Sequence, residues 1–503
     1  MIMENELNYE KFLELNKDEM IEGLAAVLRC KSEQTEAVKA PRTAGADAGA
    51  AAAQDDEIYP FGEGVQEAFT TFLKLASDMG FETYNADNYG GHVDFPGTGD
   101  KILGIIGHLD VVPAAGGWDF DPYGADVRDG YIYGRGTTDD KGPMVSCLYA
   151  MKALKDAGFQ PAATIRLIIG LDEETNWKGM DYYFAKSDVR KPDFGFTPDG
   201  DFPIINGEKG ILVFELARKF ANTASQSKGL KLRSIKGGMA ANSVADTCRV
   251  VIRNMNADAE PYAKVREEIA AFREETGYKI RSKGVGKSLE ITTEGISAHG
   301  AKPDMGLNAI SVMMAFLGRL NFADEEHNDF IDFYNKYIGF CLDGEKLGIN
   351  FSDEPSGKLV FNVGMAEMNE KAASLTINVR YPVTMTGDDV YDAMADLLEK
   401  YNFGVIKEKD QAPIYKDLDD PMIETLLEIY RRHTGDTESE PLVIGGGTYA
   451  RSCDNIVAYG ALFPGDPDIM HQRNECLSIE RFEQMTKIYA EAIYKLASGE
   501  YNN

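Results

Sequence analysis

The segment KILGIIGHLD at residues 101–110 is a continuous apolar run that ends in polar residues. Two later segments repeat this pattern, ATIRLIIGLDEE at 163–174 and DFGFTPDG at 193–200. Continuous apolar runs are typical of strands buried on both faces of a parallel sheet. A helix-like segment at 142–158, GPMVSCLYAMKALKDAG, separates the first two runs. This alternation predicts the α/β class, with a mainly parallel sheet flanked by helices.

Polar residues follow each of these three predicted strands. His108 and Asp110 follow the first strand, Asp172 to Glu174 follow the second, and Asp199 follows the third. In open sheets of this type, ligands bind beyond the carboxyl ends of the strands. The three strand ends therefore predict a functional site at this edge of the sheet.

The character of the sequence changes after NGEKG at 206–210. Residues 211–407 alternate strand-like segments with helix-like ones, and KLVFNVGMAEMNEKAASLTINVRYPV among them is typical of a hairpin. A later helix-like segment, PMIETLLEIYRRHTG, resumes the pattern of the first part. We therefore expect a catalytic domain made of residues 1–210 and 408–503. The inserted α+β domain at 211–407 is long enough for two βαββαβ units.

The N-terminal part carries two more helical patterns, at residues 8–30 and 64–79, and short strands are expected near Thr83 and Val93. Between the helices, VKAPRTAGADAGAAAAQDD at 38–56 has no large apolar anchor. We expect this stretch to be a surface loop without a role in the site.

The composition excludes several classes of partner. The 503-residue chain has 82 acidic and 52 basic residues, which gives a net charge of −30. Such a charge repels nucleic-acid phosphates and anionic lipid surfaces, so neither partner is expected. Six cysteines without a CxxC pair favour a reducing compartment. The N-terminus lacks a signal-peptide pattern and no apolar run approaches about 18 residues, so we expect a cytoplasmic protein without a membrane anchor.

Histidines and carboxylates in loop-like segments are candidates for metal binding. His108 is followed two residues later by Asp110, a carboxylate that can orient an imidazole ligand. Alone, this pair is also compatible with an ordinary polar strand end. The segment GRGTTDDKGP at 134–143 places Asp139 and Asp140 before a helix, where an acid can equally serve as an N-cap.

Three successive acids in LDEETNW at 171–177 are costly to place together unless a cation neutralises them. Adjacent Glu173 and Glu174 can then divide the roles of base and ligand. With Asp199 and His471 they form a mixed nitrogen and oxygen donor set that suits Zn or Mn. Two ions about 3.5–4 Å apart can share one carboxylate and activate a water molecule. Covalent catalysis is disfavoured, because the sequence has no GxSxG elbow and no plausible Cys–His couple.

Nine motifs give the chain a resemblance to a known family. In chain order they are GHLDVVP, WDFDPYG, DGYIYGRGTTDDKGP, LDEETNWKG, FTPDGDFPIINGEKG, SAHGAKPDMGLNAI, INVRYP, GGGTYAR and FPGDPDIMHQRNE, and they span about 107 to 475. The chain thereby resembles the dinuclear metallopeptidases of the aminoacylase and carboxypeptidase G superfamily, and within it the peptidase V-type dipeptidases. The resemblance implies a zinc-peptidase-like catalytic domain with an enlarged ferredoxin-like lid.

The resemblance also implies roles for individual residues. Five residues match the ligands of two divalent ions, Zn with Mn or Co as alternatives: His108, Asp139, Glu174, Asp199 and His471. Asp139 matches the ligand that bridges both ions, whereas Glu174 and His471 complete one site and His108 and Asp199 the other. Asp110 matches the residue that orients His108. Glu173 matches the general base, which takes a proton from the bridging water and passes it to the leaving amine.

Four lid residues match positions that contact substrate in the family. His299 in SAHGAKP matches the histidine that stabilises the oxyanion, and Asn242 in ANSVAD matches a residue that contacts bound substrate. Arg380 in INVRYP matches the arginine that holds the substrate carboxylate, a task that suits a guanidinium. Gly446 belongs to GGGTYAR at 445–451, which resembles the loop that closes over the carboxylate end.

Two further features place the chain within the superfamily. An aspartate at Asp199 is typical of its dipeptidases and aminopeptidases, whereas the carboxypeptidase G branch has glutamate. The long lid resembles that of peptidase V-like members, in which it supplies its own histidine and replaces a partner subunit. A monomer is therefore implied.

The residues and the resemblance together favour metal-dependent hydrolysis of short peptides, above all dipeptides with a free N-terminus. The alternative within enzymes is an N-acyl amino acid amidohydrolase, such as a deacylase or desuccinylase, with the same metal site. A non-catalytic peptide-binding or metal-storing protein would be favoured by loss of the base, but Glu173 and all five ligand candidates are present.

Overall fold

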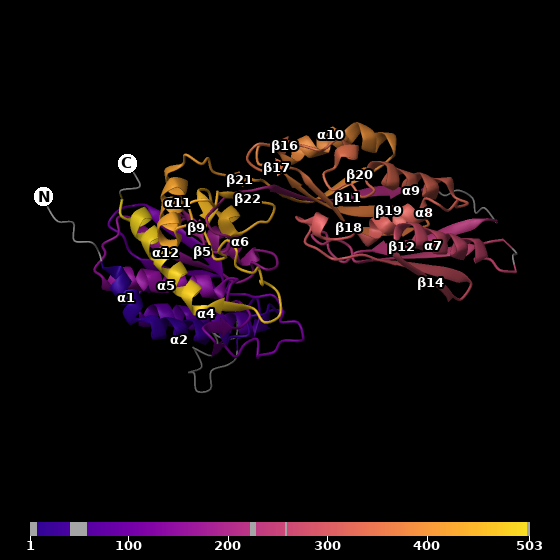
Figure 1. Cartoon of the computed structure of the whole chain (residues 1–503). Coiled ribbons are helices and arrows are strands. Elements are labelled where there is room, and N and C mark those ends of the chain that lie inside the picture. Colours follow the sequence, from indigo (N-terminus) through magenta and orange to yellow (C-terminus); the bar gives the residue numbers. More distant parts are fainter. Residues whose placement is uncertain (1–7, 41–57, 222–227, 257–258, 500–503) are drawn as a thin grey trace. The chain divides into compact units, whose positions relative to one another are not determined.

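The computed structural model describes residues 8–40, 58–221, 228–256 and 259–499 (Figure 1). Most of the loop expected at 38–56 lies outside these residues. In the described parts of the chain, none of the helices combines the length and apolar character needed to cross a bilayer.

The chain forms two compact units. The first contains Met1–Asn206, Lys416–Leu442 and Gly447–Asn503, and the second contains Gly207–Tyr415 and Val443–Gly446. The boundaries expected for the inserted domain, 211 and 407, stay a prediction.

The first unit is built around a mainly parallel sheet with the strand order β23–β9–β5–β8–β4–β3. Strands β23, β9, β5 and β8 are parallel, whereas β4 and β3 extend the sheet antiparallel at one edge. The bounds are β3 Glu82–Asn85, β4 Gly91–Phe95, β5 Ile102–His108, β8 Thr164–Gly170, β9 Phe194–Thr197 and β23 Ile456–Ala458. The three apolar runs are thus the adjacent strands β8, β5 and β9, which confirms the predicted α/β class.

Smaller strands complete this unit. Strands β24, β7 and β6 form a three-stranded antiparallel sheet, and β1 pairs with β2. The short strands β10 and β22 each include a point at which the chain passes from the first unit to the second. The bounds are β1 Val38–Lys39, β2 Ile58–Tyr59, β6 Asp126–Arg128, β7 Tyr131–Tyr133, β10 Ile205–Glu208, β22 Leu442–Ile444 and β24 Cys476–Ser478.

Three helices of the first unit lie where the sequence patterns predict them, at 63–78, 141–156 and 421–434. The helices of this unit are α1 Tyr9–Leu15, α2 Lys17–Leu28, α4 Glu63–Asp78, α5 Lys141–Asp156, α6 Lys178–Ala185, α11 Pro421–Thr434 and α12 Ile479–Ala497, with a 3₁₀ turn, η3, at Tyr449–Ser452. The single helix expected at 8–30 is wrong, because the chain breaks at Asn16. This residue ends α1 and precedes α2 with a non-helical backbone. Asparagine favours such helix boundaries because its side chain competes for backbone hydrogen bonds.

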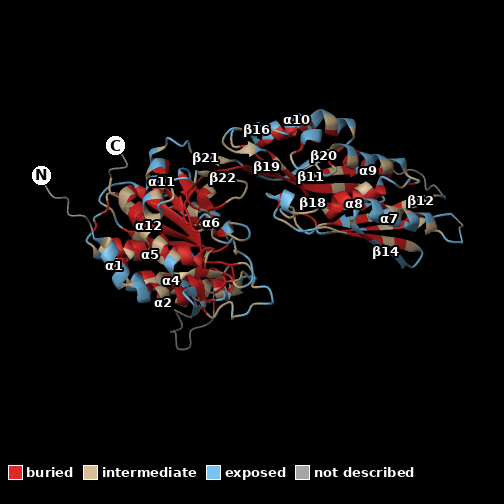
Figure 2. Cartoon of the chain, viewed as in Figure 1, coloured by how far each residue is buried: buried red, intermediate tan, exposed pale blue. Residues whose placement is uncertain are grey.

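Helix α5 is almost completely buried, and Figure 2 shows buried residues concentrated along it and in the strands of this unit. Gly107 lets the carboxyl end of β5 approach the start of this helix. A Cβ atom at Gly107 would lie 2.1 Å from an Asp140 carboxylate oxygen and 2.4 Å from the Met144 sulfur. The missing side chain therefore allows His108, the next residue, to lie beside the loop that precedes α5.

The second unit contains an eight-stranded antiparallel sheet with the order β14–β15–β13–β12–β18–β19–β11–β20. The predicted hairpin is present as β18 and β19, which pair from Val360↔Arg380 to Met368↔Ala373. The strand bounds are β11 Gly210–Lys219, β12 Leu230–Gly237, β13 Thr247–Asn254, β14 Lys279–Val285, β15 Ser288–Glu294, β18 Val360–Asn369, β19 Ala372–Tyr381 and β20 Gly404–Gln411.

Helices of the second unit bury the apolar residues of this sheet. They are α7 Ala263–Thr276, α8 Ala309–Leu317, α9 Glu325–Tyr337 and α10 Gly387–Lys400, with short 3₁₀ turns at Pro303–Met305 and Glu345–Leu347. Small strands β16 Ser352–Asp353, β17 Gly357–Lys358 and β21 Ile414–Tyr415 complete the unit. Along β11, the buried Leu212, Phe214 and Leu216 alternate with half-buried residues, as expected for a sheet with one covered face.

A buried histidine in the first unit predicts a pH-dependent stability. His92 on β4 lies with its Nδ1 atom 2.7 Å from the Tyr183 hydroxyl, and burial lowers the pKa of His92 to about 4. An unfolded histidine has a pKa near 6.5, so between about pH 6.5 and 4 the unfolded state binds the extra proton. Stability should therefore fall as the pH falls through this window, by about 2 kcal/mol from this group between pH 7 and 5.

Urea unfolding of the chelator-treated protein at pH 7 and pH 5 tests this prediction. The control is His92→Phe, because phenylalanine can keep the stacking on Tyr84 and the edge contact with Tyr183 without titrating. The variant should lose less stability than the wild type over the same pH range. Equal losses would show that His92 does not carry the effect.

Candidate active site

The carboxyl ends of three neighbouring strands bring the predicted site residues together. His108 is the last residue of β5, Asp172 to Glu174 follow β8, and Asp199 follows β9. Strand β5 lies between β8 and β9, and all three are parallel. Their carboxyl ends therefore share one edge of the sheet, as the sequence pattern predicts.

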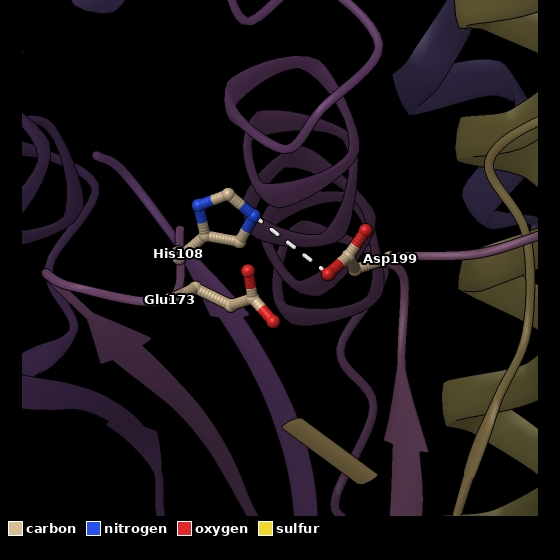
Figure 3. A group of neighbouring side chains, drawn as sticks. All are labelled: His108, Glu173 and Asp199. Carbon is tan, nitrogen blue, oxygen red and sulfur yellow. Dashed lines mark ion pairs between the residues drawn. The ribbon is translucent and has the colours of Figure 1, made fainter. Parts of the chain in front are cut away.

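One group at this edge consists of His108, Glu173 and Asp199. Each offers one potential ligand atom, and these atoms all lie within 4.8 Å of one another. His108 is completely buried, and its Nε2 atom lies 3.7 Å from an Asp199 oxygen. Figure 3 shows the three side chains converging from separate strand ends.

A second group consists of Asp139, Glu174 and His471, whose potential ligand atoms also lie within 4.8 Å of one another. Asp139 comes from the loop before α5, and His471 comes from the loop before β24. The His471 Nε2 atom lies 2.8 Å from Asp139 Oδ2 and 2.9 Å from Glu174 Oε1.

Asp139 links the two groups. Its Oδ1 atom lies 3.0 Å from His108 Nε2, and its Oδ2 atom lies 2.8 Å from His471 Nε2. One carboxylate thus has an oxygen facing each histidine, which is the arrangement expected of a ligand shared by two ions. The donor set of imidazole nitrogens and carboxylate oxygens, without thiolates, fits a pair of hard or borderline divalent cations.

Asp110 orients both a histidine and the acidic turn. Its Oδ1 atom lies 3.4 Å from Nδ1 of His108, and its backbone oxygen lies 3.0 Å from the same nitrogen. Its two carboxylate oxygens also accept hydrogen bonds from the backbone N–H groups of Glu173 and Glu174, each at 3.1 Å. A single buried carboxylate therefore fixes residues of both groups.

Burial and neighbouring charges shift the pKa values of the clustered side chains. Burial raises the pKa of Glu173, and Asp199 raises it further. Burial and Asp139 likewise raise the pKa of Glu174. Hydrogen bonds to Asp139 and Glu174 raise the pKa of His471 to about 11. For each of these three groups a neighbouring carboxylate contributes to the shift toward the protonated form, and a bound divalent cation would offset that negative charge.

Glu173 is a member of the first group as well as the expected general base. The resemblance gives it the role of general base, and its potential ligand atom lies within 4.8 Å of those of His108 and Asp199. Its backbone is fixed by Asp110 and by the indole N–H of Trp177, which donates to the Glu173 carbonyl at 2.8 Å. The geometry is compatible with either a base or a ligand.

The predicted lid residues lie together in the second unit. Asn242 and His299 are on adjacent loops, because Gly300 N–H donates to the Asn242 carbonyl at 2.7 Å and Ser243 forms a β-bridge with His299. Both side chains are exposed. The backbone N–H of Ala301 lies 3.3 Å from Nδ1 of His299.

Arg380 and the glycine loop lie next to the His299 loop. The Arg380 side chain is buried and donates from Nη1 to the Gly445 carbonyl at 2.9 Å and from Nε to Asn378 Oδ1 at 2.9 Å. A Cβ atom at Gly445 would lie 3.2 Å from the Ala301 side chain. Gly446 follows in this loop. The structure therefore gathers all four lid residues in one region of this unit.

Sequence reasoning gave no role to Glu475, although it lies in the quoted motif HQRNE. Its side chain is completely buried and pairs with Arg135. Tyr449 was also left without a role, and its buried ring packs edge-on against His108 and Trp177. The signal that could have found Glu475 is an acid four residues after a metal-ligand histidine.

Comparison with known proteins reveals similarities over most of the chain. The model of Peptidase family M20/M25/M40 matches residues 104–495. The chain is 34% identical over 495 residues to "Putative dipeptidase YtjP" of Bacillus subtilis strain 168, covering 98% of this chain and 100% of that protein. It is 36% identical over 443 residues to "Putative dipeptidase SH1171" of Staphylococcus haemolyticus, covering 87% and 92% respectively.

A solved structure shares the fold. The di-peptidase Dug1p from Saccharomyces cerevisiae superposes with a TM-score of 0.53 at 14% identity, over 98% of both chains. At this identity the likeness concerns the fold alone.

Proposed function

Because this chain belongs to peptidase family M20/M25/M40 and is a metallopeptidase, we propose that it hydrolyses dipeptides with a free N-terminus by means of two divalent ions. The names of the two bacterial relatives support the substrate class. The observation that carries the two-ion proposal is the Asp139 carboxylate, whose oxygens lie 3.0 Å from His108 and 2.8 Å from His471.

In this proposal Asp139 bridges the two metal sites. His108 and Asp199 complete one site, and Glu174 and His471 complete the other. Asp110 keeps the His108 imidazole oriented through its Nδ1 atom. Zinc suits this donor set, and manganese or cobalt are alternatives. When bound, such divalent ions would lower the pKa of a water molecule and polarise the peptide carbonyl.

Glu173 is the proposed general base. It takes a proton from the attacking water and returns it to the leaving amine, which balances the proton over the reaction. Its position in the first group, beside His108 and Asp199, supports this role. The hydrogen bond from its backbone N–H to Asp110 and the one from the Trp177 indole to its carbonyl fix the Glu173 backbone, from which the carboxylate extends.

The lid residues are proposed to recognise the substrate. His299 donates a hydrogen bond to the oxyanion, and Asn242 on the adjacent loop contacts the bound peptide. Arg380 holds the substrate carboxylate, supported by its buried stem and by bonds that already orient its guanidinium. Backbone N–H groups near Gly446 assist at the same end. With the lid supplied by the same chain, we propose a monomeric enzyme, and a cytoplasmic location stays a prediction.

Hydrolysis by metal-stripped protein, with Zn, Mn and Co restored separately, tests the proposal. The substrates are a dipeptide, the matching tetrapeptide and the N-acetyl derivative of the dipeptide's first residue. We expect metal-restored cleavage of the dipeptide with a kcat/KM at least about 100-fold above the other two, which corresponds to about 2.7 kcal/mol of transition-state discrimination. Cleavage of the N-acetyl compound alone would instead establish the N-acyl amino acid amidohydrolase. Cleavage of none, with two ions bound, would refute the substrate class.

A further inference from the structure

A buried ion pair, Arg135–Glu475, connects the loops that carry Asp139 and His471. Arg135 Nη1 lies 2.6 Å from Glu475 Oε2, and the two side chains are only 2% and 1% exposed. Burying two charges costs desolvation energy that often cancels their attraction, so such a pair is weak evidence for stability. Its position between two ligand loops points to a different role.

The second oxygen of Glu475 holds the chain that leads to Asp139. Its Oε1 atom accepts hydrogen bonds from the backbone N–H groups of Gly136 at 3.1 Å and Thr138 at 3.0 Å, and from the Thr138 hydroxyl at 3.0 Å. Thr138 directly precedes Asp139. The Glu475 carboxylate therefore restricts where the proposed bridging ligand can lie.

The second nitrogen of Arg135 holds His471. Its Nη2 atom donates to the His471 carbonyl at 3.2 Å. His471 has a φ of 61°, a left-handed conformation that is uncommon for residues other than glycine. Such a conformation persists when the surrounding contacts determine it, and the Arg135 bond is one of them.

Neighbouring contacts keep these two loops side by side. Glu475 accepts a backbone hydrogen bond from Gly134 at 3.0 Å, and the next residue, Cys476, pairs with Tyr133 between β24 and β7. The pair therefore contacts the backbone around two members of the second ligand group. The described hydrogen bonds of the pair reach the loops of Asp139 and His471, whereas His108 of the first group is oriented by Asp110.

We propose that Arg135 and Glu475 are positioning residues that set the metal affinity of the site formed by Asp139, Glu174 and His471. The inference rests on the proposed function, because it takes both groups as metal sites. His471, held by Arg135, belongs to this site alone. Loss of the pair should therefore weaken this ion much more than the other, which the pair can affect only through the shared Asp139. Outer contacts of this kind typically change metal affinity by about 10–100-fold.

The test measures Zn binding by competition with a chromogenic chelator in the wild type and in Glu475→Gln. In Glu475→Gln, we expect the more weakly bound ion to have a Kd about 10–100-fold above its wild-type value. The Kd of the other ion should stay within about threefold of its wild-type value. In a His471→Ala background, which already lacks a ligand of that site, adding Glu475→Gln should change the remaining ion by less than about threefold.

The matched control is Asp94→Asn, which breaks the bidentate Arg166–Asp94 pair between β4 and β8. This pair is also largely buried, at 12% and 14% side-chain exposure, but its hydrogen bonds join β4 to β8 and involve no member of either ligand group. It should lower thermal stability and leave both Zn affinities within about threefold. Selective loss in Glu475→Gln but not in Asp94→Asn separates positioning from general destabilisation.

Arg135→Lys provides a second route if Glu475→Gln does not fold. Lysine keeps the positive charge beside Glu475 but lacks a second nitrogen for the His471 carbonyl. The same selective weakening is expected. Equal weakening of both ions, or unchanged binding, in the folded variant would overturn the inference. Fewer than two Zn ions on the wild type would refute the two-metal function itself, and with it this inference.

Discussion

Glu173→Gln is expected to lower kcat for dipeptide hydrolysis by about 10³-fold and to leave two metal ions bound. Glutamine has the size of glutamate but cannot accept the proton from water, so the chemical step loses its base. The backbone N–H bond from residue 173 to Asp110 does not depend on the side chain and should persist. Steady-state kinetics together with metal analysis of the same sample measure both quantities.

The adjacent residue supplies the matched control. Glu174→Gln changes the same functional group one position later, beside His471 rather than His108. As a proposed ligand it should lose one ion, whereas Glu173→Gln should lose none. If Glu173→Gln also releases an ion, its carboxylate acts as a ligand of the His108–Asp199 group. Near-wild-type turnover would show that the base is elsewhere.

The sheet and the gathering of the acids at its edge could be predicted because both depend on local sequence. Strands β5, β8 and β9 are continuous apolar runs, and polar residues begin where each run ends. Strand direction then places those residues at one edge without knowledge of longer contacts. The resemblance adds the roles, which stay predictions until the variants are measured.

Features that depend on distant contacts or on backbone conformation could not be predicted. The break at Asn16 is a choice between one long helix and two short ones, and periodicity favours the long helix. The Arg135–Glu475 pair joins residues 340 positions apart. Much of what Glu475 binds is backbone N–H, which leaves no pattern of side chains in the sequence.

The two neighbouring glutamates after β8 show what the residues alone leave open. Sequence adjacency alone shows only that Glu173 and Glu174 both follow β8, and it was the resemblance that paired Glu174 with His471. In the structure Glu173 joins the His108 group and Glu174 joins the His471 group. Two neighbouring side chains thus serve different groups because the turn after β8, held by Asp110, directs them apart.

Asp139→Asn is expected to weaken both metal ions, by about 100-fold or more each, and to lower kcat/KM by about 10³-fold. The amide keeps the size of the carboxylate but removes the charge that faces both imidazoles. Because Oδ1 lies near His108 and Oδ2 near His471, the loss should reach both sites at once. Zn competition titrations and kinetics at saturating Zn measure the two effects separately.

The neighbouring Asp140 provides the matched control, which shows whether metal binding depends on the Asp139 carboxylate itself or on any negative charge next to His108. Its Oδ2 atom accepts a hydrogen bond from the His108 backbone N–H at 3.0 Å, and an asparagine carbonyl oxygen can accept the same bond. Asp140→Asn should therefore keep both ions within about tenfold, although burying an extra N–H₂ group can cost about 1–3 kcal/mol of stability. Release of only one ion by Asp139→Asn, as expected for Glu174→Gln, would mean that Asp139 serves a single site. A two-ion centre would then need a different shared ligand.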